Sequence, residues 1–130
     1  MSAKEDLILV VDDEEPVRDV VSKLVKHIGY PVLMAANGKQ ALDLMRKEPV
    51  TILITDIKMP VMDGLQLLQE IRKMGSKTDV IMVTAYGEVE SYLKAMSLGA
   101  AEYINKPIRI KELKQIVHKV LTEQRTRPGS

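Results

Sequence analysis

The chain has 130 residues, of which 45% are hydrophobic and 28% charged, an ordinary balance for one globular domain. Nineteen basic and eighteen acidic residues nearly cancel, so the net charge gives no reason to expect nucleic-acid binding. The absence of cysteine excludes disulfides and thiolate metal sites, and no apolar run approaches the roughly 18 residues of a membrane span. Without a charged-then-apolar leader, the chain is expected to be a soluble cytoplasmic domain with no membrane contact.

Short runs of β-branched residues alternate with segments of helical periodicity along the chain. Three of these runs are almost continuously apolar, as expected for strands buried on both faces of a parallel sheet. We predict strands at 7–11, 31–36, 51–55, 79–84 and 101–105. We predict helices around the apolar residues of 17–28 and 113–121 and at 38–47, 64–73 and 88–98, with stops at Gly29, Gly75 and Gly99.

This alternation predicts a single α/β domain over residues 1–124. Right-handed crossovers between parallel strands place helices on both faces of a sheet. The expected fold class is therefore a doubly wound, five-stranded parallel sheet of the flavodoxin-like type. Residues 125–130, "RTRPGS", are predicted to be a disordered tail or the remnant of a linker.

Four consecutive carboxylates, "DDEE" at 12–15, directly follow the first predicted strand. Like charges this close resist ionisation unless a cation lies among them. Other predicted strands also end in polar groups, and the carboxyl ends of parallel strands meet at one edge of a sheet. Glu14 and Glu15 are expected in the first turn of the next helix, near the positive end of its dipole. We expect one pocket to contain Asp12, Asp13, Asp56, Thr84 and Lys106.

This set of groups suits phosphoryl transfer. Mg²⁺ prefers hard oxygen ligands, and the cation would make the cluster tolerable and neutralise charge on the transferring group. Taken singly, each residue has an ordinary structural explanation. Asp56 could cap a helix, Thr84 could satisfy a backbone group, and Lys106 could be a surface lysine. Their joint placement at strand ends is what indicates a site.

Four motifs at the ends of the predicted strands resemble those of one family, the receiver domain of two-component response regulators, which has the fold of the chemotaxis response regulator. The resemblance covers roughly residues 5–122, and the motifs occur in the family's order. The motifs are "VVDDE" (10–14), "LITDIKMPVMDG" (53–64), "MVTAYG" (82–87) and "LGAAEYINKPI" (98–108).

The resemblance implies that Asp56 is the phosphoacceptor, whose carboxylate attacks a phosphohistidine and becomes an acyl phosphate. Asp12 and Asp13 then correspond to ligands of the Mg²⁺ cofactor, with Asp56 and the backbone carbonyl of Lys58 completing the protein's set. Lys106 would pair with Asp56 before transfer and with a phosphoryl oxygen afterwards. The domain would not be an enzyme for a separate substrate, since it catalyses only its own phosphorylation and dephosphorylation.

The same resemblance implies a switch pair. Thr84 would hydrogen-bond a phosphoryl oxygen, and Tyr103 occupies the position of the aromatic switch residue. Lys58 and Tyr86 lie two residues beyond Asp56 and Thr84, where they would tune the lifetime of the phosphoryl group. A cis peptide bond is expected between Lys106 and Pro107.

The partner implied by the resemblance is a sensor histidine kinase or a phosphotransfer protein. The signal would leave through the surface built by residues 88–120, where an output domain, a downstream protein or a second copy of the chain would dock. The chain is expected to be a single-domain regulator, a diffusible relay or the receiver part of a larger protein. With no Trp or Phe for stacking, direct contact with nucleic acid is not expected.

Other classes remain as alternatives. A haloacid-dehalogenase-type phosphatase also uses a strand-end Asp and Mg²⁺, but it needs a second Asp where "TDIKMP" has Lys58. A flavodoxin-like electron carrier needs a phosphate loop rich in glycine and hydroxyl groups after the first strand, where this chain has "DDEE". A dinucleotide site would need G-x-G-x-x-G at the same place. The last alternative is a purely structural α/β module.

Overall fold

The computed structural model describes residues 6–85 and 89–127, in which strands and helices alternate. The strands are β1 (Leu7–Val11), β2 (Val32–Ala35), β3 (Val50–Asp56), β4 (Asp79–Thr84) and β5 (Glu102–Asn105). The helices are α1 (Glu15–His27), α2 (Gly38–Lys47), α3 (Gly64–Lys73), α4 (Val89–Ser97) and α5 (Ile110–Thr126). Neighbouring strands are parallel, in the order β2-β1-β3-β4-β5. The predicted fold class, a doubly wound parallel sheet, is confirmed.

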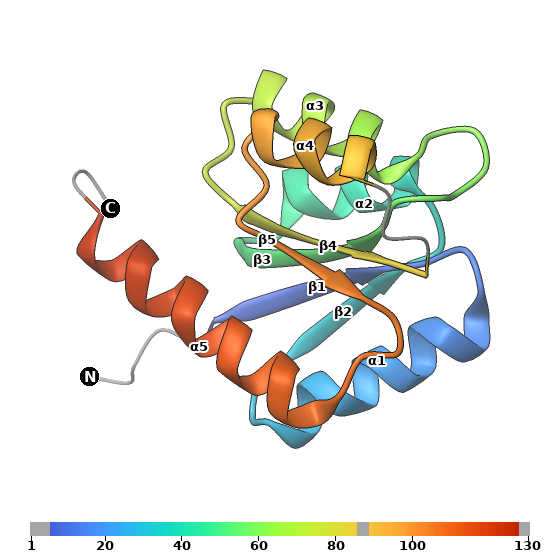
Figure 1. Cartoon of the computed structure of the whole chain (residues 1–130). Coiled ribbons are helices and arrows are strands. Elements are labelled where there is room, and N and C mark those ends of the chain that lie inside the picture. The colour runs from blue at the N-terminus through green and yellow to red at the C-terminus, as the bar shows by residue number, and fades with distance from the viewer. Residues whose placement is uncertain (1–5, 86–88, 128–130) are drawn as a thin grey trace.

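Helices cover both faces of the sheet, with α1 and α5 on one face and α2, α3 and α4 on the other (Figure 1). Successive side chains of a strand point to opposite faces. In β1, Ile8 and Val10 therefore belong to the core beneath α1 and α5, whereas Leu9 and Val11 belong to the core beneath the other three helices. Because both faces are covered, residues of either parity are apolar, which explains the continuous apolar runs in the sequence.

Three helices are followed by glycines, as the sequence predicts. Gly29, Gly75 and Gly99 have φ angles of 106°, 76° and 94°. These values lie in the left-handed region, which residues other than glycine rarely adopt. Each of these turns redirects the chain toward the sheet. All the paired strands run in the same direction, so their carboxyl ends meet at one edge.

Several boundaries differ from those predicted. β2 is one residue shorter at each end than the predicted 31–36, and β3 is one residue longer at each end than 51–55. α5 continues to Thr126, so residues 125 and 126, which were predicted to belong to the tail, are helical. The apolar periodicity of this helix ends at Leu121, and its last turn is held by polar contacts that the periodicity does not reveal.

Two further expectations concern residues at the limits of what the structure describes. The helix predicted at 88–98 is observed as Val89–Ser97, and residue 88 lies outside the described residues. Tyr86, expected to tune the phosphoryl lifetime, also lies outside them. Across residues 6–85 and 89–127, no helix combines the length and apolar character needed to cross a membrane.

Candidate functional site

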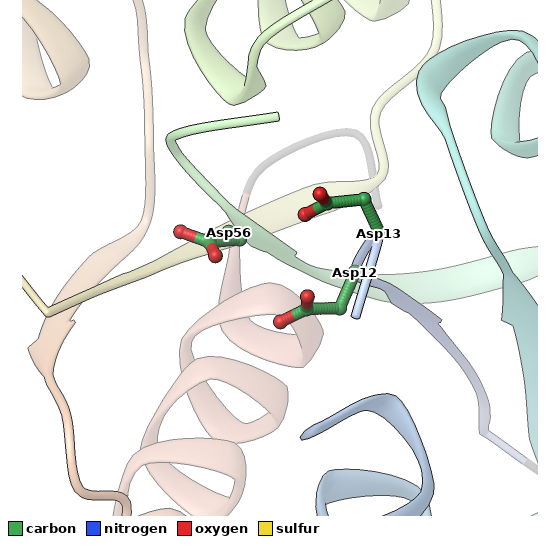
Figure 2. A group of neighbouring side chains, drawn as sticks. All are labelled: Asp12, Asp13 and Asp56. Carbon is green, nitrogen blue, oxygen red and sulfur yellow. The ribbon is translucent and has the colours of Figure 1, made fainter. Parts of the chain in front are cut away.

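Three carboxylates meet where β1 and β3 end. The two strands are paired, with Val11 opposite Thr55, so the residues that follow these two lie side by side. One carboxylate oxygen from each of Asp12, Asp13 and Asp56 lies within 4.8 Å of the others (Figure 2). Asp12 and Asp56 are buried, at 4% and 8% exposure, while Asp13 is exposed. The cluster is therefore deep on one side and open to water on the other.

Lys106 brings a single ammonium group to this cluster from the segment after β5. Its Nζ lies 3.0 Å from Oδ2 of Asp56 and 3.4 Å from Oδ2 of Asp12. Its backbone N–H donates to the carbonyl of Thr84 at 2.8 Å, which fixes this segment to the end of β4. The peptide bond to Pro107 is cis, as the resemblance implies. Three carboxylates against one ammonium leave the cluster with excess negative charge.

The electrostatics of the cluster follow from burial and this excess. Burial raises the pKa of Asp12, and the neighbouring charge of Asp56 raises it further, against the lowering effect of hydrogen bonds from Glu14 and Lys106. Burial alone would lower the pKa of Lys106, but its hydrogen bond to Asp56 and the nearby negative charges outweigh burial and raise that pKa. The ammonium is thus held in its charged form, and among the described residues the three carboxylates still outnumber it.

Thr84 ends β4, the strand next to β3, and its side chain is buried at 1% exposure. The register pairs Val83 with Asp56 and Thr84 with Asn105. Thr84 therefore stands one position beyond the residue opposite Asp56, at the same edge as the carboxylates. The structure brings all five residues of the predicted pocket to the carboxyl ends of neighbouring strands.

The loop after β3 is shaped around Asp56. The N–H of Lys58 lies 3.3 Å from Oδ1 of Asp56, while the side chain of Lys58 is exposed. A Cβ on Gly64 would lie 2.3 Å from the carbonyl oxygen of Asp56, so only glycine permits this close return of the loop. Asp63 caps α3 in a capping box with Gln66. These contacts fix the backbone on both sides of the Asp56 carboxylate.

Arg18 of α1 is a residue of the site that the sequence analysis missed. Its Nη1 donates to the backbone carbonyl of Asp12 at 2.7 Å, and the N–H of Glu14 donates to Oδ1 of Asp12 at 2.9 Å. Together the two bonds hold the turn between β1 and α1. An arginine in an amphipathic helix gives no signal in the sequence that it reaches back six residues to a strand end.

Tyr103 lies on β5 with its ring partly buried against the core beneath α2, α3 and α4. The ring of Tyr92, from α4, meets it edge-on, with 5.4 Å between centroids and 81° between planes. Such pairs stabilise by about 0.5–1.5 kcal/mol beyond the area they bury. The residue expected to be the switch is thus in direct contact with α4, through a partner that the sequence alone did not identify.

The chain belongs to the response regulator receiver domain family, whose family model matches residues 8–118. Phosphorylation on aspartate and Mg²⁺ binding at an acidic pocket are general properties of receiver domains in two-component signalling. The match spans both the carboxylate cluster and the segment that carries Lys106. The recognition made from the four motifs is confirmed.

Two curated relatives of similar identity differ in how much of their own length this chain covers. Sporulation initiation phosphotransferase F of Bacillus subtilis (strain 168) is 37% identical over 114 residues, which are 88% of this chain and 92% of that protein. The probable transcriptional regulator ycf27 of Porphyra purpurea is 40% identical over 121 residues, which are 93% of this chain but only 49% of that protein. The chain therefore spans about half the length of one relative and nearly all of the other.

Solved structures of receiver domains have the same fold. A receiver domain protein from Clostridium thermocellum superposes with a TM-score of 0.87 at 30% identity, over 92% of this chain and 97% of that one. The response regulator TrrA from Thermotoga maritima, solved in complex with Mg²⁺ and BeF, gives a TM-score of 0.80 at 36% identity, over 88% of this chain and 98% of that one.

Proposed function

We propose that Asp56 accepts a phosphoryl group from a sensor histidine kinase or a phosphotransfer protein. The observation that carries this proposal is the buried Asp56 carboxylate at a strand end, paired with Lys106 at 3.0 Å and beside two further carboxylates. A nucleophile needs an orienting partner, and the excess negative charge needs a cation. The family's general chemistry supplies the reaction class.

The transfer is a displacement at phosphorus. A carboxylate oxygen of Asp56 forms the new O–P bond while the N–P bond to the donor imidazole breaks, and the departing imidazole keeps that electron pair. Lys106 orients the Asp56 carboxylate before the reaction and neutralises a phosphoryl oxygen after it. The Thr84 hydroxyl donates to another phosphoryl oxygen. The domain acts as phosphoacceptor and catalyst of this one reaction, with no separate substrate.

The donor set fits Mg²⁺. It offers three carboxylate oxygens within 4.8 Å of one another, and the exposed Asp13 leaves one side open to the waters that Mg²⁺ keeps. Asp12, Asp13, Asp56 and the backbone carbonyl of Lys58 would hold the ion. When bound, it supplies positive charge to the transferring oxygens and to the carboxylates.

An apolar groove beside the site supports the assignment of a protein as donor. It has a volume of about 510 Å³ and lies between α1 and the segment after β5. Lys106 lines both this groove and the carboxylate cluster, so a protein that delivers a phosphoryl group to Asp56 would cover the groove. Val20, on α1, lines this groove and is 57% exposed. We assign the groove to the kinase or phosphotransfer protein.

The signal would leave through the surface of residues 88–120 as a population shift between two packings. The phosphoryl group would draw Thr84 toward it, and Tyr103 would change position in response. The edge-on contact of Tyr103 with Tyr92 supports this route, because it joins β5 directly to α4. α4 also exposes apolar side chains to which an output domain, a downstream protein or a second copy could bind. These side chains are Val89, Tyr92, Leu93 and Met96.

The direct test is covalent labelling. With acetyl phosphate and Mg²⁺, the parent chain should gain the mass of one phosphoryl group, whereas Asp56→Asn should gain none. Asp63→Asn is the matched control, because it makes the same chemical change at the other end of the same loop and asparagine still caps a helix. Labelling of Asp56→Asn to the level of the parent would refute the assignment.

A further inference from the structure

A second group of charged side chains lies at the opposite edge of the sheet, where the strands begin. Asp79, the first residue of β4, is buried at 5% exposure. Its carboxylate accepts a hydrogen bond from Nε2 of Gln124 at 2.9 Å and from Nη2 of Arg127 at 3.3 Å. Nε2 of Gln124 also reaches the carbonyl of Thr51, on β3, at 3.4 Å. We call Asp79, Gln124 and Arg127 the α5 anchor.

A weaker pair lies beside the anchor. Nη2 of Arg125 is 2.8 Å from Oδ2 of Asp6, the residue before β1. The Arg125 side chain is 65% exposed, so this ion pair is well screened by water. The last turn of α5 is thus attached to the beginnings of three adjacent strands, β1, β3 and β4, at the left of Figure 1.

The anchor replaces the apolar contacts that hold the rest of α5. The buried side chains of this helix end at Leu121, so none of them fixes the last turn. Helix ends without tertiary contacts ordinarily fray. A carboxylate with so little exposure needs polar partners, since burial of an unpaired charge is costly. Asp79 therefore obtains its polar partners from the end of α5, and the last turn of α5 is held to the sheet by its hydrogen bonds to Asp79.

The backbone stops being helical at the anchor. Arg127 has φ −71° and ψ 134°, an extended conformation, and its guanidinium reaches back to Asp79. The next residue in the sequence is Pro128, and the residue before a proline is biased against helical geometry. The anchor and the sequence preference before proline both favour an end of the helix at Arg127.

We propose that Asp79 is a positioning residue that fixes the end of α5, including Arg127, to the sheet and keeps this end of α5 stationary when the phosphorylated domain switches. The second part rests on the proposed function, whereas the first does not. The surface of residues 88–120, which includes α4 and β5, would then change shape beside a fixed end of α5 at residues 120–127.

Amide hydrogen exchange of the unphosphorylated chain tests the anchor. In Asp79→Asn and in Arg127→Gln, exchange at residues 122–126 should rise about ten-fold, because each variant removes a charge-assisted hydrogen bond from the last turn. Lys114→Gln, which removes a charge from an exposed position on the same helix, should leave these rates unchanged. Unchanged exchange in both anchor variants would overturn the proposal.

A double variant distinguishes direct pairing from two separate effects. If Asp79 and Arg127 act through each other, the variant with both substitutions should exchange little faster than either single variant. A rise equal to the product of the two single effects would overturn the pairing. Arg127 is 45% exposed, so Arg127→Gln leaves the core intact and keeps the exchange test decisive even where Asp79→Asn fails to fold.

Amide chemical shifts with beryllofluoride and Mg²⁺ test the stationary end. In the parent, shifts should extend from residues 56 and 84 to 90–115 but leave 120–127 in place, whereas in Asp79→Asn they should reach 120–127. Equal shifts at 90–115 and 120–127 in the parent would overturn this part. If no residue responds, the proposed function fails, while the exchange experiment still decides whether the anchor exists.

Discussion

The two edges of the sheet each carry buried aspartates, but they differ in charge balance. At the carboxyl edge, Asp12, Asp13 and Asp56 meet the single ammonium of Lys106. At the amino edge, the two carboxylates of Asp6 and Asp79 meet two guanidinium groups and the amide of Gln124. Both clusters join strand ends to residues distant in sequence. In the first cluster the carboxylates outnumber the ammonium that pairs with them, whereas in the second each carboxylate has its own guanidinium partner.

This difference separates a reactive site from a structural one. Surplus negative charge held at short distance attracts a divalent cation and a transferring phosphoryl group bound to it. A balanced cluster has no such attraction, and its hydrogen bonds can only hold elements together. An aspartate at a strand end is therefore not sufficient evidence of a site. The ratio of carboxylates to cations around it decides.

The largest difference is expected between Asp56→Asn and Asp79→Asn. The first should abolish phosphorylation by acetyl phosphate completely, while the second should keep the parent's labelling, since Asp79 lies at the other end of the sheet. Intact-mass spectrometry after equal incubation measures both. Loss of labelling in a folded Asp79→Asn chain would show that the two edges are not independent.

A comparison of the kinase with acetyl phosphate as donors should distinguish the role of the apolar groove from that of the carboxylate cluster. Val20→Glu should lower the rate of transfer from the cognate kinase about ten-fold or more, because a buried unpaired charge is costly at a protein interface. Its reaction with acetyl phosphate should be unchanged. Met74→Glu, at an apolar residue 39% exposed after α3, is the matched control. Equal transfer rates to both variants would contradict the assignment of the groove.

The stability of the two edges should respond in opposite directions when a carboxylate is neutralised. Asp79→Asn should lower the free energy of unfolding by about 1–3 kcal/mol, because it removes the charge that Gln124 and Arg127 share. Asp13→Asn should raise the stability of the metal-free chain by about 0.5 kcal/mol, because it relieves repulsion at an exposed position. Urea unfolding in a chelator measures both, and a loss of stability in Asp13→Asn would contradict the surplus-charge account.

The smallest effect is expected at the exposed pair of the amino edge. Asp6→Asn should lower the free energy of unfolding by only about 0.2–1 kcal/mol, since Arg125 is largely solvated. The same urea experiment compares it with Asp79→Asn. A cost for Asp6→Asn equal to that of Asp79→Asn would show that burial is not what strengthens the anchor.

The sequence was sufficient for the carboxyl edge because parallel strands impose it. Once the apolar runs are read as buried parallel strands, Asp12, Asp56 and Lys106 must follow strands that end at one edge. Local capping preference likewise accounts for Asp63, since aspartate is favoured at helix N-caps and this residue caps α3. Regular geometry and local capping rules carry these predictions without knowledge of any tertiary contact.

The amino edge could not be predicted in this way. Asp79 and Gln124 are 45 residues apart, and neither their spacing nor the end of the apolar pattern indicates that they meet. The contact of Tyr92 with Tyr103 is hidden for the same reason. Val61 even contradicts local preference, since a β-branched residue rarely adopts its φ of 70°. Such features depend on the packing of whole elements.

A titration of the metal-free parent chain with Mg²⁺, followed by amide chemical shifts, tests most directly whether charge surplus distinguishes the two edges. The shifts should concentrate at Asp12, Asp13, Asp56 and Lys58, saturate with one ion, and leave Asp6, Asp79 and 124–127 unmoved. Shifts of similar size and midpoint at Asp79 and the end of α5, or no saturable shift at the carboxyl edge, would contradict the account.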